Sequence, residues 1–321
     1  MTTNGIPNEF KRKLFSEVRK QVVGQEEALL LITAALLAQG HVLLEDVPGT
    51  GKTTMAKALS QAFQAEFSRV QATPDLLPQD LLGAMIYRPQ TGEFELRKGP
   101  IFTQFLLFDE INRATPRTAS ALLEAMAEGQ VSIDGRTESL PAPFFVIATQ
   151  NPIESQGVFP LPEAQLDRFL VKVSLGFPSL EEEAGILRRF RSGERPEQPQ
   201  PVISPEQLRE MRQLCRSVRV SKDVETYLLE LVRKTREPKA FLTGASPRAA
   251  LALLALSQSL AWLDGRDFVT PDDIKRGVVP VLSHRVQLPP ERRAKGETET
   301  SALQDLLGQI PVPVELQSSS H

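Results

Sequence analysis

The residues best suited to chemistry stand together in one stretch, VLLEDVPGTGKT, at positions 42–53. Gly49 and Gly51 let the backbone turn its N–H groups toward phosphate oxygens. Lys52 supplies a positive charge for the terminal phosphates of a nucleotide, and the hydroxyl of Thr53 can ligate Mg²⁺. The residue types and their order therefore predict a phosphate-binding loop.

The sequence around this loop supports the prediction, with one departure. A short apolar run, residues 42–44, precedes the loop, and KTTMAKALSQAF follows it at helical spacing. Strand, loop and helix in this order are the context that the motif G-x-x-x-x-G-K-[ST] requires, and the helix N-terminus adds partial positive charge. Asp46 stands where the motif has its first glycine. The alternative interpretation is a glycine-containing turn that binds nothing.

A pair of carboxylates follows a later apolar run. QFLLFDE ends in Asp109 and Glu110, as expected for a buried parallel strand that carries acids at its carboxyl end. Asp109 can hold Mg²⁺ through water, and Glu110 can act as general base on an attacking water. Two acids after a strand are common on their own, so this prediction depends on the phosphate loop that precedes them.

Three further side chains are candidates for the same site. Asn151 ends the apolar run FFVIATQNP and could orient a water between Glu110 and the γ-phosphate, although Asn-Pro is also a turn sequence. Arg168 and Arg248 could stabilise the negative charge of a transition state. Each of them, like Arg113, would by default be a surface arginine.

The elements that must position these residues alternate between strand-like and helical patterns. Strands are expected at 42–44, 67–71, 104–110, 144–152 and 169–175, with helices between them. Two hairpins interrupt this order, one formed by 84–88 and 93–96, the other by VSIDGRTESL with Asp134-Gly135 as its turn. The alternation predicts an α/β fold, a parallel five-stranded sheet with helices on both faces.

After Phe177-Pro178 the sequence shows only helical patterns with clear start signals. Ser179 and Glu182 fit a capping box, and Ser204, Ser246 and Thr270 each precede a proline at the first helical position. We therefore expect three parts: a nucleotide-binding α/β domain (1–177), an all-helical lid domain (178–308) and a disordered tail (309–321).

Composition limits the class of protein. The chain has 321 residues, 41% of them hydrophobic and 24% charged, with a net charge of −3. A slightly acidic chain gives no electrostatic case for a nucleic-acid binder. The single cysteine excludes an internal disulfide, and the three histidines show no metal-ligand spacing with it. No segment resembles a signal peptide or a membrane span, so we expect a cytoplasmic enzyme without membrane insertion.

Taken in order, these motifs resemble AAA+ ATPases of the MoxR family over about residues 15–290. VVGQEEAL resembles the segment before the core that lines the adenine pocket, DVPGTGKTT resembles Walker A, and LLFDEINRA resembles Walker B. ATQNP resembles sensor 1, FPLPEAQLDRF the segment that bears the arginine finger, and GASPRA sensor 2. The two hairpins stand where this clade carries its inserts, and only Asp46 departs from the general Walker A pattern.

The resemblance implies a site for ATP and Mg²⁺ and a set of residue roles. Catalytic roles fall to Glu110, Asn151, Arg168 and Arg248, and metal binding to Thr53 and Asp109. The implied nucleotide-binding residues are Val23, Gly24, Val47, Pro48, Gly49, Thr50, Gly51, Lys52, Thr53 and Thr54. The resemblance further implies a hexameric ring with ATP between subunits, Arg168 acting on a neighbour's nucleotide, and chaperone-like maturation or activation of protein complexes. A von Willebrand factor A-domain partner and a protein client would accompany it.

Other readings of the same residues remain open. The ATPase subunit of a metal chelatase and a nucleic-acid motor belong to neighbouring AAA+ branches, and a motor would be stimulated by DNA or RNA in a salt-dependent way. A non-catalytic scaffold would bind nucleotide without turnover, which Glu110 and Asn151 argue against. A small-molecule kinase would leave the hairpins and the lid without a role.

Overall fold

The structure is a computed structural model that describes residues 5–152, 158–193, 196–237 and 240–313. The chain forms two compact units. The first, here the α/β unit, comprises residues 8–212, and the second, here the helical unit, comprises residues 213–321 together with residues 1–7. The predicted domain boundary between residues 177 and 178 stays a prediction, and the predicted tail falls largely on residues 314–321, outside the described residues.

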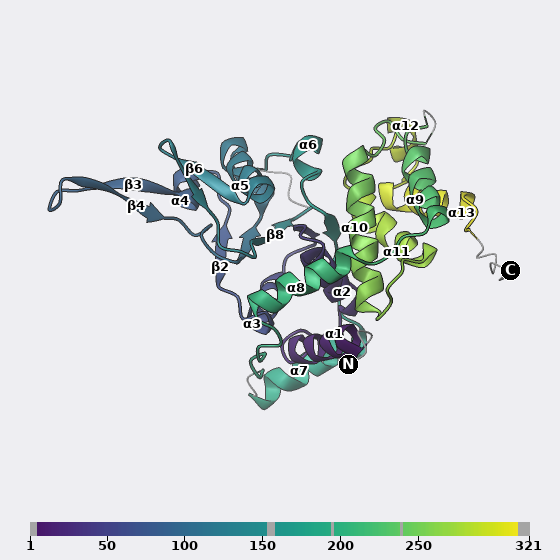
Figure 1. Cartoon of the computed structure of the whole chain (residues 1–321), viewed down its shortest axis with the longest axis horizontal. Coiled ribbons are helices and arrows are strands. Elements are labelled where there is room, and N and C mark those ends of the chain that lie inside the picture. The colour runs from purple at the N-terminus through teal and green to yellow at the C-terminus, as the bar shows by residue number, and fades with distance from the viewer. Residues whose placement is uncertain (1–4, 153–157, 194–195, 238–239, 314–321) are drawn as a thin grey trace. The chain divides into compact units, whose positions relative to one another are not determined.

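The α/β unit is built on a five-stranded parallel sheet, as predicted (Figure 1). The strand order is β2-β5-β8-β1-β9. All five strands agree with the predicted runs to within two residues at each end, and the last strand is the most shortened, from seven predicted residues to three. The bounds are β1 (Val42–Glu45), β2 (Phe67–Gln71), β5 (Phe105–Asp109), β8 (Phe145–Gln150) and β9 (Val171–Val173).

Both faces of the sheet are buried at β5, since its side chains alternate between the two faces and all five residues are buried. On one face, Leu106 and Phe108 of β5 belong to a core cluster with Leu122 of α5. On the other face, Phe105 contacts the ring of Phe63, which follows α3. The helices that lie wholly in this unit are α2 (Glu26–Leu37), α3 (Lys52–Ala62), α4 (Pro78–Leu82), α5 (Pro116–Glu128), α6 (Glu163–Leu166) and α7 (Leu180–Ser192). Most residues of α1 (Gly5–Val18) and α8 (Pro205–Arg216) also belong to it.

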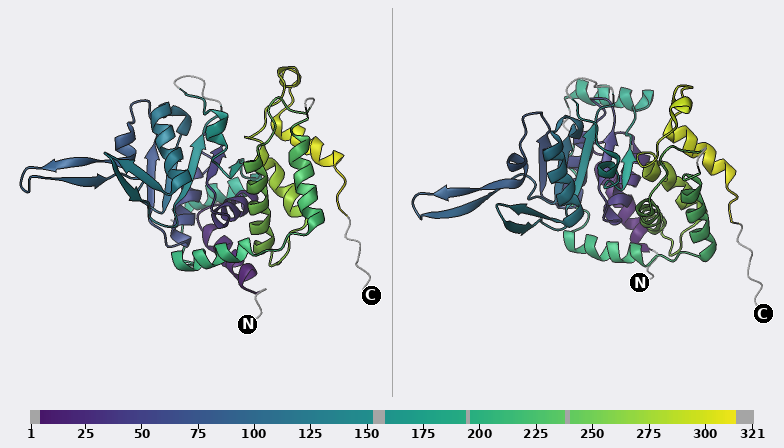
Figure 2. Two further views of the ribbon diagram at one scale, coloured as in Figure 1. Left: turned by 45° about the horizontal axis from the view of Figure 1, so that its top comes forward. Right: turned by 90° about the horizontal axis from the view of Figure 1, so that it is seen from above.

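Two β-hairpins are inserted into this unit, both where the sequence predicts them. β3 (Gly83–Arg88) and β4 (Glu93–Lys98) pair antiparallel and extend away from the sheet (Figures 1 and 2). β6 (Gln130–Ile133) and β7 (Arg136–Ser139) form the second. Its turn residues Asp134 and Gly135 both have positive φ, 48° and 79°, which is the geometry of the type I′ turn expected of Asp-Gly.

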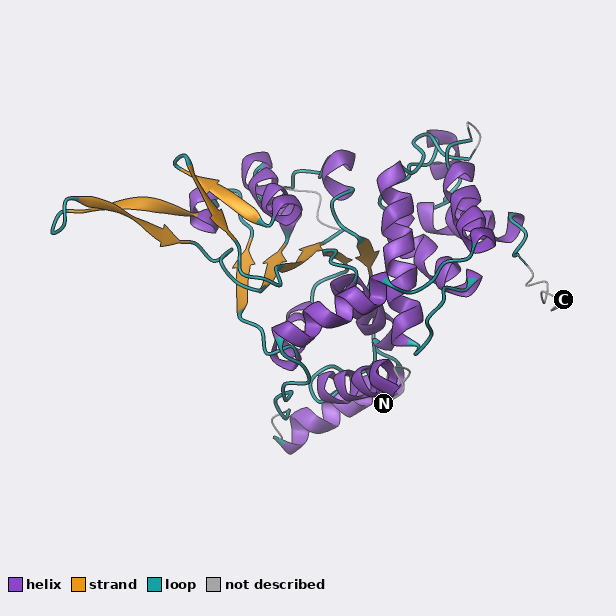
Figure 3. Ribbon diagram, viewed as in Figure 1, coloured by secondary structure: helices purple, strands orange, loops and turns teal. Residues whose placement is uncertain are grey.

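The described residues of the helical unit after Arg212 form helices without a regular sheet (Figure 3). The cap of Ser246 is confirmed, since its hydroxyl accepts from the N–H of Ala249 at 3.3 Å. Gly277 lets α10 and α11 approach closely, because a Cβ there would lie 2.8 Å from Leu253 Cδ1. The helices are α9 (Lys222–Lys234), α10 (Pro247–Leu263), α11 (Pro271–Leu282), α12 (Pro290–Arg293) and α13 (Glu299–Gln309). Among the described helices, none combines the length and the apolarity needed to cross a bilayer.

A buried histidine joins three elements of the α/β unit. Nδ1 of His41 accepts from the N–H of Val146 in β8 at 3.0 Å, so Nε2 carries the proton and donates to the carbonyl of Met126 in α5 at 3.0 Å. Burial lowers the pKa of His41 from 6.5 to about 4, against the effect of the Met126 hydrogen bond. The folded chain therefore favours the neutral ring.

This shift makes stability depend on pH. Above pH 6.5 the ring is neutral in both states, and between pH 6.5 and about 4 the unfolded chain takes up a proton that the folded chain does not. The free energy of unfolding should fall over this window by about 3 kcal/mol more in the wild type than in His41→Gln. Urea titrations of both proteins from pH 7 to 4 measure this difference, and parallel curves would exclude the linkage.

Candidate functional site

The phosphate loop runs from the carboxyl end of β1 to the start of α3. Gly49 and Gly51 have φ values of 88° and 90°, and a Cβ on either would meet nothing within 4 Å. Glycine is needed here for its backbone conformation and not for space, since other residues rarely adopt such φ. Nζ of Lys52 donates to the carbonyl of Asp46 at 2.7 Å. The lysine thus lies across the loop, at the place where phosphates would compete for it.

The predicted acids stand at the end of β5, beside the end of β8. Oδ1 of Asp109 accepts from the hydroxyl of Thr149 at 3.2 Å, and the same hydroxyl accepts from the N–H of Glu110 at 2.9 Å. Glu110 adopts a left-handed conformation, with φ 57° and ψ 50°. A non-glycine residue held this way carries strain that is frequent at functional sites. Thr149 therefore holds the carboxylate of Asp109 and the main chain of Glu110 from the neighbouring strand.

Two arginines neutralise these carboxylates. Nε of Arg69, on β2, donates to Oδ2 of Asp109 at 2.7 Å. Nη1 of Arg113, in the 3₁₀ turn Ile111–Arg113, donates to Oε2 of Glu110 at 3.2 Å. A positive partner on each acid keeps the negative charge compatible with the approach of phosphates. Arg113 thus lies at the site, although the sequence leaves it ambiguous.

Asn112 links the acidic site to the segment after β8. Its side-chain Nδ2 donates to the main-chain carbonyl of Asn151 at 3.5 Å. The main-chain carbonyl of Asn112 accepts from the N–H of Phe159 at 2.6 Å. Asn112 and Asn151 are both buried. Asn151 follows β8, whose carboxyl end is adjacent to that of β5, and its role with the acids stays a prediction.

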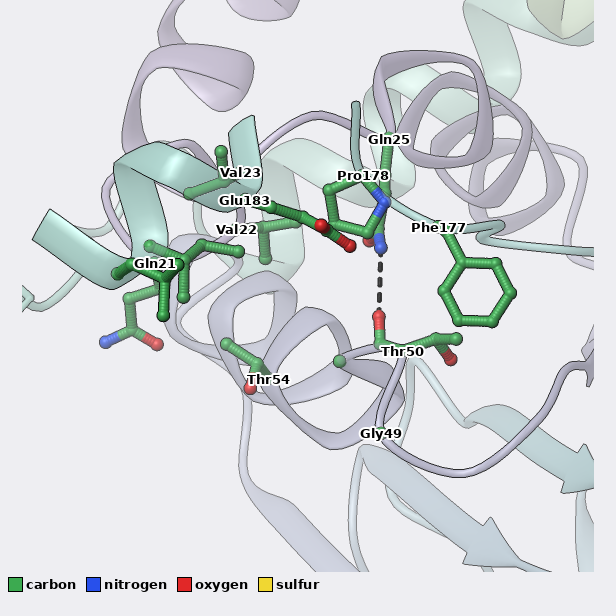
Figure 4. A pocket seen from close by; sticks show the side chains of 13 residues that line it. Gln21, Val22, Val23, Gln25, Gly49, Thr50, Thr54, Phe177, Pro178 and Glu183 are labelled. Carbon is green, nitrogen blue, oxygen red and sulfur yellow. Dashed lines mark hydrogen bonds between the residues drawn. The ribbon is translucent and has the colours of Figure 1, made fainter. Parts of the chain in front are cut away.

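A cavity of about 520 Å³ opens above the phosphate loop (Figure 4). Nε2 of Gln25 crosses to the carbonyl of Thr50 at 2.9 Å and ties the segment before α2 to the loop. One side of the cavity is polar backbone and the other is largely apolar. Its lining residues are Gln21, Val22, Val23, Gln25, Gly49, Thr50, Gly51, Thr54, Phe177, Pro178, Glu183, Ile186 and Leu187.

Of the predicted nucleotide-binding residues, half line this cavity directly: Val23, Gly49, Thr50, Gly51 and Thr54. Lys52 and Thr53 begin α3 at the same place, and Val47 and Pro48 form the loop before it. Gly24 lies close to α7, because a Cβ there would be 2.6 Å from Oε1 of Glu182.

The two predicted arginines lie in different units. Arg168 is exposed in the α/β unit, where its Nη1 donates to the carbonyl of Leu123 in α5 at 2.6 Å. Arg248 is exposed near the start of α10, in the helical unit. Their roles stay predictions.

Several contributors escape a reading of the sequence. Arg69 carries no motif signal beyond standing in a strand, and Thr149 stands within ATQNP, so its place in that motif was the available signal. Gln25 stands within VVGQEEAL, so its place in a motif was the available signal. In the sequence, Phe177 and Pro178 mark only the point after which the pattern is purely helical, yet in the structure they line the cavity.

The donors present fit a magnesium ion that keeps most of its water. The described residues hold no group of three or more His, Cys, Asp or Glu side chains suited to binding a metal by themselves. Mg²⁺ in nucleotide sites takes one or two protein oxygens, several waters and the phosphates of its substrate. The Thr53 hydroxyl and the buried carboxylate of Asp109 are oxygen donors of this kind.

Comparisons with known proteins agree with this geometry. Residues 41–171 match the ATPase family associated with various cellular activities (AAA), and residues 233–306 match the AAA lid domain. The chain is 45% identical to the uncharacterized protein YeaC of Bacillus subtilis, over 94% of this chain and 95% of that protein. It is 44% identical to Chaperone MoxR1 of Mycobacterium tuberculosis, over 87% of this chain and 75% of that protein.

A solved structure shows the same fold. The crystal structure of a provisionally assigned ATPase from Cytophaga hutchinsonii matches with a TM-score of 0.89 and 38% identity, covering 97% of each chain. Together with the relatives named MoxR, this likeness agrees with the family that the motifs predict. The chain belongs to the MoxR family of AAA+ ATPases.

Proposed function

We propose that this chain hydrolyses Mg²⁺-ATP and uses the energy for chaperone-like remodelling of protein complexes. The observation that carries the proposal is the meeting of the phosphate loop with Asp109, Glu110 and Asn151 at adjacent strand ends. Ligands of open α/β sheets bind outside the carboxyl ends of the strands. The relative named Chaperone MoxR1 supports the remodelling role.

In this proposal the chain's own groups divide the chemistry. The loop N–H groups and Lys52 hold the β- and γ-phosphates. Glu110 takes a proton from a water molecule while the oxygen of that water attacks the γ-phosphorus. The bond from that phosphorus to the bridging oxygen breaks, and ADP leaves with the electron pair. Asn151 orients the water. Bound Mg²⁺, held by Thr53 and through water by Asp109, would offset the charge of the phosphates.

We further propose that the working unit is a hexameric ring with ATP between subunits, together with a von Willebrand factor A-domain partner and a protein client. Arg168 is exposed, as a residue that acts on a neighbour's nucleotide must be. Its hydrogen bond to the Leu123 carbonyl uses one guanidinium N–H group, and the described residues take no other, which leaves further donors for phosphate. Arg248 would act on the nucleotide of its own or a neighbouring subunit.

Mixing two inactive variants tests the ring and the finger together. Arg168→Ala should lower kcat by about 1,000-fold or more, since a missing arginine finger leaves transition-state charge unpaired. A mixture of Arg168→Ala with Glu110→Gln should regain phosphate release, because one subunit supplies the base and its neighbour the arginine. Arg117→Ala, an exposed arginine of α5, is the matched control and should keep wild-type activity. A mixture that stays inactive would contradict action between subunits.

A further inference from the structure

Asp46, the residue that departs from the Walker A pattern, directs its carboxylate into the α/β unit. Its side chain is buried and is absent from the lining of the cavity. Its main chain remains part of the phosphate loop, since the N–H donates to the carbonyl of Gln150 at 3.3 Å and the carbonyl accepts from Lys52. The negative charge is therefore kept off the cavity wall, where it would oppose phosphate.

Within the described part of the chain, the donors to this carboxylate come from one short segment after β9. Oδ1 accepts from the hydroxyl of Ser174 at 2.7 Å and from the N–H of Gly176 at 3.3 Å. Oδ2 accepts from the N–H of Leu175 at 2.7 Å. Hydrogen bonds to an ionised acceptor are about twice as strong as those between neutral groups. Asp46 thus ties the first turn of the phosphate loop to residues 174–176.

The tied segment continues directly into the apolar wall of the cavity. Gly176 has a φ of 68° and turns the chain into Phe177 and Pro178, both of which line the cavity. Phe177 is 76% exposed, so packing alone does not fix its ring. The helix that follows, α7, has no buried side chain among its described residues. The position of this wall therefore depends on the main-chain anchor that precedes it.

We propose that Asp46 is a positioning residue that sets the wall formed by Phe177 and Pro178 against the phosphate loop. This inference rests on the proposed nucleotide site. The loop faces the triphosphate, and the apolar side, with Val22, Val23 and Phe177, fits the flat ring system of a base. Asp46 then contributes to the part of ATP affinity that comes from the nucleoside, and much less to the part that comes from the phosphates.

Two ligands separate these parts, namely Mg²⁺-ATP and inorganic tripolyphosphate with Mg²⁺, which lacks the nucleoside. Asp46→Gly restores the general Walker A glycine but removes the anchor. The ratio of the Kd for tripolyphosphate to the Kd for ATP should fall by about tenfold, while the Kd for tripolyphosphate changes by less than about threefold. Calorimetric titration of both ligands measures the ratio. Asp46→Asn keeps the side-chain volume but sets an amide N–H₂ against one of the donors, and it should lower the ratio in the same direction.

A double-mutant cycle with Phe177→Ala measures whether the effects of the two substitutions on the Kd ratio are coupled. A merely structural role of Asp46 would not produce this coupling. Since Asp46 acts through the position of this wall, Asp46→Asn should lower the ratio much less in the Phe177→Ala background than in the wild type. Ser174→Ala removes a single donor and should give an intermediate ratio. An unchanged ratio in both Asp46 variants, equal weakening of both ligands, or additive effects in the cycle would overturn the inference. Failure of the wild type to bind ATP would instead contradict the proposed function.

Discussion

Glu110→Gln should bind ATP as tightly as the wild type and release phosphate about 100- to 10,000-fold more slowly. The amide keeps the size of the side chain but cannot take a proton from water, and general-base catalysis contributes a factor of this order. The substitution keeps the main-chain N–H of residue 110, which donates a hydrogen bond to the hydroxyl of Thr149. Binding of a fluorescent ATP analogue and steady-state phosphate release, measured on the same preparation, separate the two effects.

The matched control is Glu128→Gln, at an exposed carboxylate that ends α5. It makes the same chemical change away from the strand ends and should leave both binding and turnover unaltered. Full-rate hydrolysis by Glu110→Gln would remove this residue from the catalytic role. Loss of binding would instead indicate that its ion pair with Arg113 shapes the site.

Lys52→Ala should weaken ATP binding by at least about 100-fold, which corresponds to about 3 kcal/mol. The ammonium group holds the phosphates, and in their absence it donates to the carbonyl of Asp46 in its own loop. Removing it takes away the charge but leaves the backbone N–H groups of the loop in place. Hydrolysis at cellular ATP concentrations should fall with the loss of binding.

Lys57→Ala provides the control on the same helix, since Lys57 is an exposed residue of α3. Its ATP affinity should match that of the wild type. Thermal unfolding of both variants without nucleotide shows whether the fold is kept. A Lys52→Ala protein that folds and still binds ATP at wild-type affinity would contradict the phosphate-binding role of the loop.

The fold was largely predictable because its signals are local. Buried parallel strands appear as continuous apolar runs, and α5 has proline at its first position, Pro116, and glycine directly after its last residue, Glu128, which are local signals of this kind. The hairpin turn at Asp134-Gly135 follows from the conformations that these residues permit. The last strand was predicted too long, since only Val171–Val173 pairs with β1.

The site was predictable only where a motif carries its residues in sequence. The phosphate loop and the acids after β5 belong to such motifs, and adjacent strand ends bring them together. Arg69 could not be assigned, because its pairing with Asp109 depends on the strand order of the sheet. Asp46 could not be explained either, since its partners Ser174 to Gly176 lie more than a hundred residues away in the chain.

The central claim is that this chain hydrolyses ATP at the phosphate loop. The most direct test measures phosphate release by the wild type and by Lys52→Ala in parallel. Both proteins receive the Mg²⁺-ATP concentration that saturates the wild type. The account predicts sustained release over many turnovers by the wild type and release at least about 100-fold slower by the variant. Equal rates in the two proteins, or no release by an assembled wild type that binds ATP, would contradict it.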